Sequence, residues 1–297
     1  MEIDDEVEDQ RGLLALPVED VVIPYILRRM DHRDLFHLRC TCRFAKDMVD
    51  HFYEDTKFLD LSRIASKASD VMLEVCLWRC RNLRILNLSG LKWITDEKLR
   101  PLLENNRSLT HIELSGCVSL TNACVQTLAV KCKNLKSISF RDCHWLSSGA
   151  MEILGQHSRH LECLDVRSCW ALENGCLKFL LARNPRLRVL RLSCIYSLTD
   201  HVMKAVAVAC RQLEDLDIRG CWRISDSGVQ MISDYCPRLR TLYVSDCRKI
   251  SRRSLQPLVD RGVNVVCTGG TAESFCYSKF DLKLLRTLEP PPKPPLS

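Results

Sequence analysis

The chain has 297 residues, with 43 Lys or Arg against 37 Asp or Glu, which gives a formal net charge of +6 at pH 7. It contains no run of about eighteen apolar residues, so we expect no membrane span. The basic excess makes nucleic-acid binding conceivable, but the basic residues are spread along the chain, and solvated helix faces are the favoured explanation.

The first segment, residues 1–12, is acidic. Six of the first ten residues are Asp or Glu, and none of the ten is basic. Such a segment cannot bury an apolar core and lacks the apolar centre of a signal peptide. We therefore expect a disordered lead on a protein of the cytoplasm or nucleus.

Residues 13–55 have the spacing of three short helices. Pro17 stands near the start of the first, followed by two acids, and both are helix-start signals. Pro24 lies inside the apolar pattern that follows, so a break or kink is expected there. A second helix should begin at Asp34 and a third should span residues 44–53. Three short helices bury little by themselves, so this module should rest on a neighbour or a partner.

Residues 56–82 precede a regular repeat and read as its N-terminal cap. Leu59 and Leu61 stand where the core positions of a preceding repeat would fall, and a capping repeat shields the open edge of a stack. At the other end, residues 263–288 should form a C-terminal cap. Residues 289–297 are a proline-rich tail, either solvated or a ligand for an SH3 or WW domain.

Between the caps, residues 83–262 repeat with a period of 26. The pattern Leu-x-x-Leu-x-Leu-x-x-Cys, with some apolar replacements, begins at Leu83, Leu109, Leu135, Leu161, Leu187, Leu213 and Leu239. This period predicts a leucine-rich-repeat solenoid, an α/β fold with short parallel strands inside and helices outside. Counting the first leucine as position 0, we expect positions 3 and 5 in the core. Positions 2, 4 and 6 then face the other way, and a helix starts near position 12.

The cysteines mostly belong to the repeat. Nine of the eighteen occupy position 8, position 23, or the equivalent of position 23 before the first repeat. Leu91 and Ile195 replace cysteine at position 8, so a small buried apolar group is wanted there. No Cys-x-x-Cys pair occurs, and we predict no zinc site, no disulfide framework and no cofactor. Reduced thiols again favour the cytosol or nucleus.

The chain resembles the F-box/leucine-rich-repeat family of the cysteine-containing type in two features. One is the 26-residue repeat with its cysteine and its Ile-Thr-Asp helix start. The other is the string Leu16-Pro17-x-Glu19-Asp20 followed by Asp34-Leu35-x-x-Leu38-Arg39. The resemblance implies a substrate-recognition subunit of an SCF ubiquitin ligase. Its F-box would dock on a Skp-type adaptor, which brings a cullin and a RING subunit, and its solenoid would bind a protein target for degradation. The implied adaptor-binding residues, with the core beneath them, are Leu14, Leu16, Pro17, Ile23, Ile26, Leu27, Leu35 and Leu38.

The resemblance is closer to one branch of that family. Residues 16–24 and the exit at 261–263 are similar to members associated with ubiquitination of HECT-class ubiquitin ligases that restrain BMP signalling, which suggests a target of that class. Thr41 stands where the family usually has valine, and we expect this departure to affect only the packing around residue 41. A plain helical hairpin capping the solenoid is the alternative for residues 13–55.

The candidate target-binding residues lie on the inner strand positions and just beyond each strand. Position 9 is aromatic in four consecutive repeats, and stacking should align these rings along one rim. Exposed aromatic and arginine side chains often anchor protein interfaces. The candidates are Arg141, His144, Trp145, Arg167, Trp170, Arg191, Tyr196, Arg219, Trp222 and Tyr243. Two alternatives remain: the rings pack over the neighbouring loops, or the arginines pair with aspartates of adjacent strands.

Motifs of catalysis are missing from the sequence. It has no Gly-x-x-x-x-Gly-Lys phosphate loop, no His-Glu-x-x-His and no Gly-x-Ser-x-Gly. We therefore expect a non-catalytic receptor with no catalytic or metal-binding residue. The alternative function is a solenoid scaffold that binds a protein or an RNA without ubiquitin transfer.

Overall fold

The computed structural model describes residues 16–65, 74 and 78–267 of the chain. The acidic lead, Leu14, most of the expected C-terminal cap and the proline-rich tail lie outside these residues.

Residues 16–55 form a helical module. Its elements are the π-helix η2 (Val18–Ile26), the 3₁₀ turn η3 (Leu27–Arg29), α1 (His32–Arg39) and α2 (Arg43–Asp55). The expected break at Pro24 is not present, because η2 continues through it. Pro24 has no backbone N–H in any helix type, so η2 passes this residue with one backbone hydrogen bond fewer. Helix α1 begins earlier than predicted, since the Asp31 carboxylate accepts a hydrogen bond from the Asp34 amide at 2.8 Å.

The solenoid is built on one parallel sheet of nine strands in chain order. The strands are β1 (Phe58–Asp60), β2 (Ile85–Asn87), β3 (His111–Glu113), β4 (Ser137–Ser139), β5 (Cys163–Asp165), β6 (Val189–Arg191), β7 (Asp215–Asp217), β8 (Thr241–Tyr243) and β9 (Asn264–Val266). Position 3 of each repeat pairs with position 3 of the next, as Leu86 does with Ile112. The predicted leucine-rich-repeat fold is confirmed.

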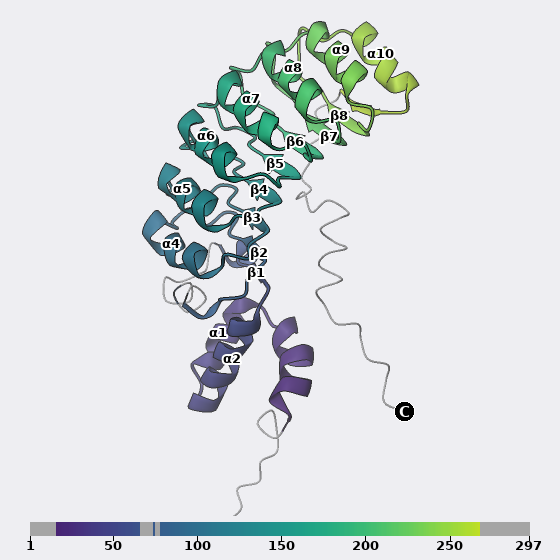
Figure 1. Cartoon of the computed structure of the whole chain (residues 1–297). Coiled ribbons are helices and arrows are strands. Elements are labelled where there is room, and N and C mark those ends of the chain that lie inside the picture. The colour runs from purple at the N-terminus through teal and green to yellow at the C-terminus, as the bar shows by residue number, and fades with distance from the viewer. Residues whose placement is uncertain (1–15, 66–73, 75–77, 268–297) are drawn as a thin grey trace, which may run out of the picture.

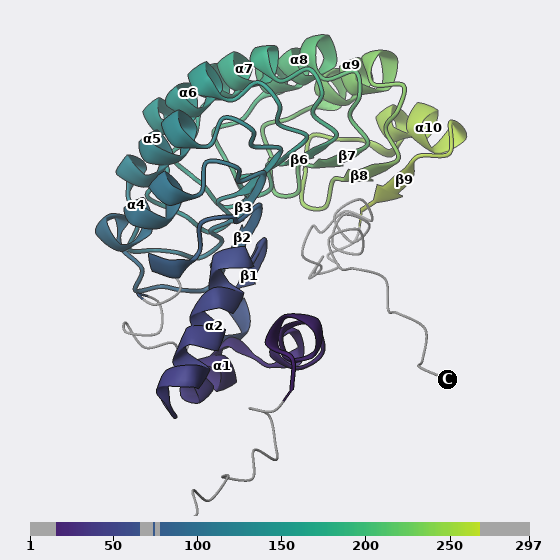
Figure 2. The same ribbon diagram turned by 60° about the horizontal axis from the view of Figure 1, so that its bottom comes forward.

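Helices form the outer layer of the arc, and the strands line its inside (Figure 1). The helices are α4 (Asp96–Asn105), α5 (Asn122–Lys131), α6 (Ser148–His157), α7 (Asn174–Arg183), α8 (Asp200–Ala209), α9 (Asp226–Tyr235) and α10 (Arg252–Asp260). Seen from below, the same arc has α1 and α2 against its β1 end (Figure 2). Within the described part of the chain, no helix is both long and apolar enough to cross a membrane.

The cysteines at position 8 do more than fill space. Each is buried, and its thiol donates a hydrogen bond to the carbonyl of position 5 in the preceding repeat, as Cys143 does to Leu114 at 3.1 Å and Cys169 to Phe140 at 3.1 Å. Cys117, Cys221 and Cys247 repeat the contact at 3.0 to 3.3 Å. The same carbonyl already accepts the amide of position 8 in its own repeat, as Leu114 does from Cys117 at 3.1 Å, so the thiol adds a second hydrogen bond that leucine cannot make.

The acidic residue that opens a helix links one repeat to the next. The Asp200 carboxylate accepts hydrogen bonds from the Ser225 amide at 2.8 Å and the Ser225 hydroxyl at 2.6 Å. Asp226 holds Ser251 in the same way, at 2.6 and 2.8 Å. The Ile-Thr-Asp signal thus marks a contact between repeats as well as a helix start.

The helical module is joined firmly to the solenoid. Asp50 on α2 is 4% exposed and pairs with Arg39 of α1 at 2.6 Å and with Arg79 of the capping region at 3.0 Å. The Asn82 side chain also donates to the Glu54 carbonyl at 3.0 Å. One continuous hydrophobic cluster runs from Val22 in the module to the end of the solenoid. The junction therefore holds the module in a fixed orientation.

We predict that this junction weakens in acid. His32 stacks on Tyr53, and burial lowers the pKa of His32 below its ordinary value of 6.5, although nearby Asp60 and Asp31 partly oppose this. The unfolded chain then binds the proton more readily than the folded one, so stability is complete above pH 6.5 and falls as the pH drops below it. Urea midpoints at pH 7.5 and 5.5 measure the loss, which should be smaller for His32→Gln. An equal loss in both proteins would contradict the assignment.

Candidate protein-interaction surfaces

Three large apolar side chains of the helical module face solvent: Leu16 at 40% exposure, Tyr25 at 44% and Phe44 at 41%. We use the name apolar face for these three residues and Pro17, which is also exposed; they lie on η2, at the start of α2 and on the segment that leads into η2. A small module that leaves this much apolar surface uncovered is suited to a partner. The sequence pattern missed Tyr25 and Phe44, although Phe44 lies at the start of the amphipathic helix α2.

The other predicted adaptor-binding residues lie deeper. Ile23, Ile26 and Leu38 are half-buried and pack against the core. Leu27 and Leu35 have no exposed surface. These two hold the helices together and cannot touch a partner while the module is folded, so their contribution to binding would be indirect.

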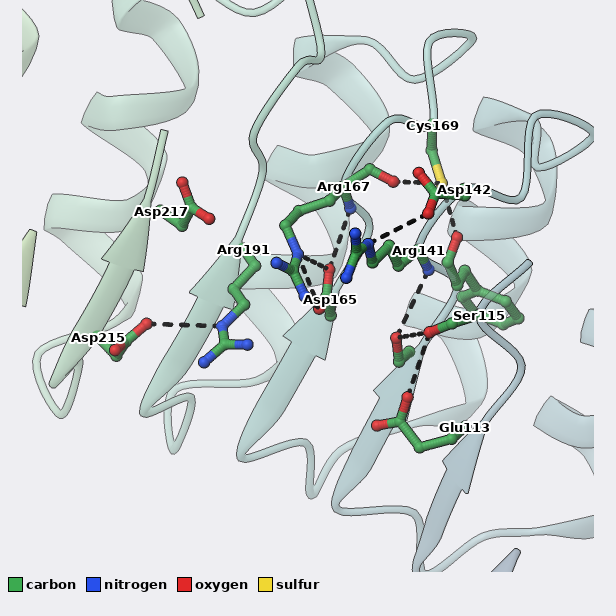
Figure 3. A network of polar contacts seen from close by, with 12 residues as sticks. Glu113, Ser115, Arg141, Asp142, Asp165, Arg167, Cys169, Arg191, Asp215 and Asp217 are labelled. Atoms are coloured by element: carbon green, nitrogen blue, oxygen red, sulfur yellow. Dashed lines mark hydrogen bonds and ion pairs between the residues drawn. The ribbon is translucent and has the colours of Figure 1, made fainter. Parts of the chain in front are cut away.

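On the inside of the arc, most of the candidate arginines are used by the fold. Arg167, two residues beyond the end of β5, is 7% exposed and donates to both oxygens of Asp165, at 2.9 and 2.6 Å (Figure 3). Arg219 makes the same pair with Asp217, at 2.9 and 2.6 Å. Such bidentate pairs are geometrically specific and leave few donors for a ligand. We expected these arginines to pair with aspartates of adjacent strands. Arg167 and Arg219 instead each pair with the aspartate two residues earlier in the same repeat.

Arg191 and Asp215 are the cross-strand case, with 3.7 Å between Nε and the carboxylate (Figure 3). Burial raises the pKa of the Asp215 carboxyl, and the nearby Arg191 opposes that rise. Arg141 differs from these arginines, because its side chain is 43% exposed and pairs with Asp142, its sequence neighbour, at 3.1 Å. Of the four predicted arginines, Arg141 is the best placed to contact a target.

Two of the predicted aromatic residues also serve the fold. Trp145 is half-buried, its indole N–H donates to the Cys117 carbonyl at 2.8 Å, and its ring meets Phe140 edge-on at 5.9 Å between ring centres. Tyr243 lies under the Arg219 guanidinium, 5.2 Å from the ring centre, and burial raises its pKa. We therefore leave Trp145 and Tyr243 out of the candidate surface.

The rings at position 9 are exposed in a row, which we call the aromatic rim: His144, Trp170, Tyr196 and Trp222. The last three have 55%, 49% and 46% of their surface exposed. His144 stacks on Trp170 with 4.0 Å between ring centres and shares a hydrogen bond with the Ser168 carbonyl at 3.0 Å. These rings thus line the edge of the arc and are not covered by the adjacent loops.

Backbone hydrogen bonds hold the rim loops in register beyond the strands. The position 7 amide of one repeat donates to the position 6 carbonyl of the next, as Asp142 does to Arg167 at 2.9 Å and Ser168 to Ser193 at 2.9 Å. Because this ladder continues through the loops, the position 9 rings of consecutive repeats are placed side by side.

The buried cysteines provide no reactive centre. Burial raises the pKa of Cys143 and of Cys210 to about 12, and that of Cys236 to about 11. The described residues also contain no group of three or more His, Cys, Asp or Glu side chains arranged to hold a metal ion.

This predicts which thiols will react in the native protein. At pH 8 a maleimide should label exposed Cys40, Cys42 and Cys267 within minutes, while Cys143 and Cys210 should require denaturant, because only the thiolate reacts. Peptide mass spectrometry before and after denaturation measures both classes. Rapid native labelling of Cys143 would contradict the packing described here.

Comparison with known proteins agrees with the two-part architecture. The F-box domain model matches residues 13–57, and a leucine-rich-repeat model matches residues 209–233. A search of curated proteins found no match. The predicted combination of an F-box with leucine-rich repeats is thereby confirmed.

A comparison with solved structures gives two similar proteins. The chain is similar to the yeast complex of Rad7 and Elc1, with a TM-score of 0.57 and 17% identity over 80% of this chain and 71% of that one. It is also similar to the leucine-rich-repeat protein LegL7 of Legionella pneumophila, with a TM-score of 0.43 and 14% identity over 73% and 85% of the two chains. At 17% identity the first likeness shows a common fold.

Proposed function

Because the chain carries an F-box domain followed by a leucine-rich-repeat solenoid, we propose that it is the substrate-recognition subunit of an SCF ubiquitin ligase. The apolar face would dock on a Skp-type adaptor, which connects to a cullin and a RING subunit. The solenoid would hold a protein target for ubiquitination and proteasomal degradation. The observation that carries the proposal is the exposed apolar face on the module that matches the F-box model.

The chain would act without catalytic groups of its own. Holding a target lysine near a ubiquitin thioester raises its effective concentration, which can lower the barrier by several kcal/mol. The junction at Asp50 suits this role, because a fixed orientation between module and solenoid sets where a bound target stands. A likeness to the yeast complex of Rad7 with Elc1 fits a partner at this module. The target class suggested by residues 16–24, a HECT-class ligase of BMP signalling, is the first to try.

Affinity purification tests the proposal. The wild type should recover the Skp adaptor and cullin from cells, and the double variant Leu16→Ala, Pro17→Ala should lose both, since these exposed residues can change without disturbing the fold. Tyr235→Ala is the control, because Tyr235 is another exposed large apolar residue, on α9 and far along the chain from Leu16. If the adaptor is absent from both the wild-type and the control samples, and circular dichroism shows that the protein is folded, the proposal is wrong. The alternative, a solenoid scaffold without ubiquitin transfer, would then be favoured.

A further inference from the structure

The aromatic rim is an exposed surface that the fold does not need. Its rings hold no core position, yet Trp170, Tyr196 and Trp222 each expose close to half of their surface. The stacked pair of His144 and Trp170 shows that part of the row is already ordered. Ordered, exposed aromatic rings lose little entropy on binding and are typical anchors of an interface.

The backbone just before the rim, at position 7 of each repeat, lies in the left-handed region. Position 7 has a positive φ in all seven repeats and is glycine in Gly90, Gly116 and Gly220. In the other four repeats it is Asp142, Ser168, Cys194 and Asp246, with φ of 59°, 61°, 61° and 63°. A side chain in this region costs roughly 1 kcal/mol or more relative to glycine. Because Gly220 precedes Trp222 and Asp246 precedes Arg248, the residue at position 7 does not follow the aromatic residues at position 9.

At its C-terminal end the rim becomes strongly basic. Exposed cations follow Trp222 over the last two repeats, and we call them the basic end: Arg223, Arg248, Lys249, Arg252 and Arg253. Arg223 also lines a shallow hollow with His201 and Lys204. Three acids lie nearby: Asp200, which lines the same hollow and accepts hydrogen bonds from Ser225; Asp226, which accepts from Ser251 and Ser254; and exposed Asp246. The local charge is therefore clearly positive.

We propose that the aromatic rim and the basic end together bind an extended segment of a protein partner, in which apolar or aromatic side chains stand next to a run of carboxylates. The apolar residues would lie on the rings, and the carboxylates would meet the basic end. If the proposed function holds, this segment is the recognition element of the target.

The arrangement of the cations favours carboxylates over a phosphate. A phosphate site gathers several donors on one point, as bidentate arginine does. Here the cations are spread over two repeats on exposed side chains, so they suit a charge that is also spread along a chain. Neighbouring strands of a sheet lie about 4.8 Å apart, so the four rings extend over about 14 Å, the length of four to five residues of extended chain.

The test is a selection with a displayed library of random 16-residue peptides on the purified full chain. Three variants are panned in parallel: the rim variant Trp170→Ser, Trp222→Ser; the charge variant Arg223→Glu, Arg248→Glu, Lys249→Glu; and the control Arg100→Glu, Arg107→Glu, Arg186→Glu, which reverses three exposed cations elsewhere. Wild type and control should enrich peptides that combine Asp or Glu runs with aromatic residues. Affinity for the best peptide should fall at least tenfold in the rim and charge variants and stay within twofold in the control.

Several outcomes would overturn the inference. One is that the selected peptides bind the rim and charge variants with the same affinity as the wild type. Another is a selected pool that lacks acidic runs. A third is a tenfold gain in affinity when phosphoserine replaces glutamate in the best peptide. Competition by a single-stranded RNA at lower concentration than the peptide would also overturn it. Circular dichroism confirms that each variant is folded. The selection needs no adaptor, so its failure leaves the proposed function standing, whereas loss of adaptor binding leaves a successful selection intact.

Discussion

Replacing Asp50 by alanine is expected to lower the free energy of unfolding by about 3 kcal/mol, because it removes one side of a largely buried ion pair. Asp50 is 4% exposed, and Arg39 loses an ion pair of 2.6 Å. Arg79 loses its 3.0 Å contact as well, so the variant should also loosen the module from the solenoid. Urea denaturation measures the first effect, and hydrogen exchange over residues 43–55 measures the second.

Glu54→Gln is the matched control for this prediction. Glu54 also pairs with Arg79, at 3.1 Å, but both side chains are 40% exposed or more, so the pair should contribute less than about 1 kcal/mol. If Asp50→Ala were no more destabilising than Glu54→Gln, the buried pair would not hold the junction.

Replacing Phe140 by alanine should cost about 3 to 5 kcal/mol, the range for truncating a fully buried aromatic side chain. Phe140 occupies position 5, has no exposed surface, and meets the ring of Trp145 edge-on. The cavity would remove the support under Trp145 at the base of the rim. Thermal and urea unfolding measure the loss, and the near-ultraviolet circular dichroism of tryptophan reports the loosened ring.

Phe140→Leu separates cavity formation from a general need for an aromatic ring. Leucine stands at the same position in Leu88, Leu114 and Leu192, so the solenoid accepts it in other repeats. The leucine variant should keep more than half of the stability that the alanine variant loses. Equal losses would mean that the contact with Trp145, and not filled volume, provides the stabilisation.

Periodicity predicted the solenoid because each leucine of the repeat has one structural task. Leu86, Ile112 and their equivalents pair across the sheet at the register that the 26-residue spacing requires. The capping position of Leu59 is also visible in the sequence, and Leu59 lies on β1. The course of the chain through Pro24 was not predictable, because it depends on a π-helical winding that has no sequence period of its own.

The candidate surface was harder to predict, because a sequence does not show which charges neutralise each other. Arg167 lies two residues after Asp165, the last residue of β5, and the bidentate pair forms between these close sequence neighbours. The prediction for position 9 was more accurate than that for the arginines, because three of its rings are exposed and fill no core position. The positive φ of Ser168 and Cys194 appears only in the structure, because glycine, aspartate, serine and cysteine all occur at position 7.

The most direct test of the central claim, that the module docks on an adaptor through its apolar face, is the binding isotherm of the purified chain with a purified Skp adaptor. The wild type should form a saturable one-to-one complex. The double variant Tyr25→Ala, Phe44→Ala should bind at least about tenfold more weakly, as for interface anchors in general. Both residues are exposed, so the fold should survive the change. Equal affinity in wild type and variant, or no complex with a folded wild type, would contradict the claim.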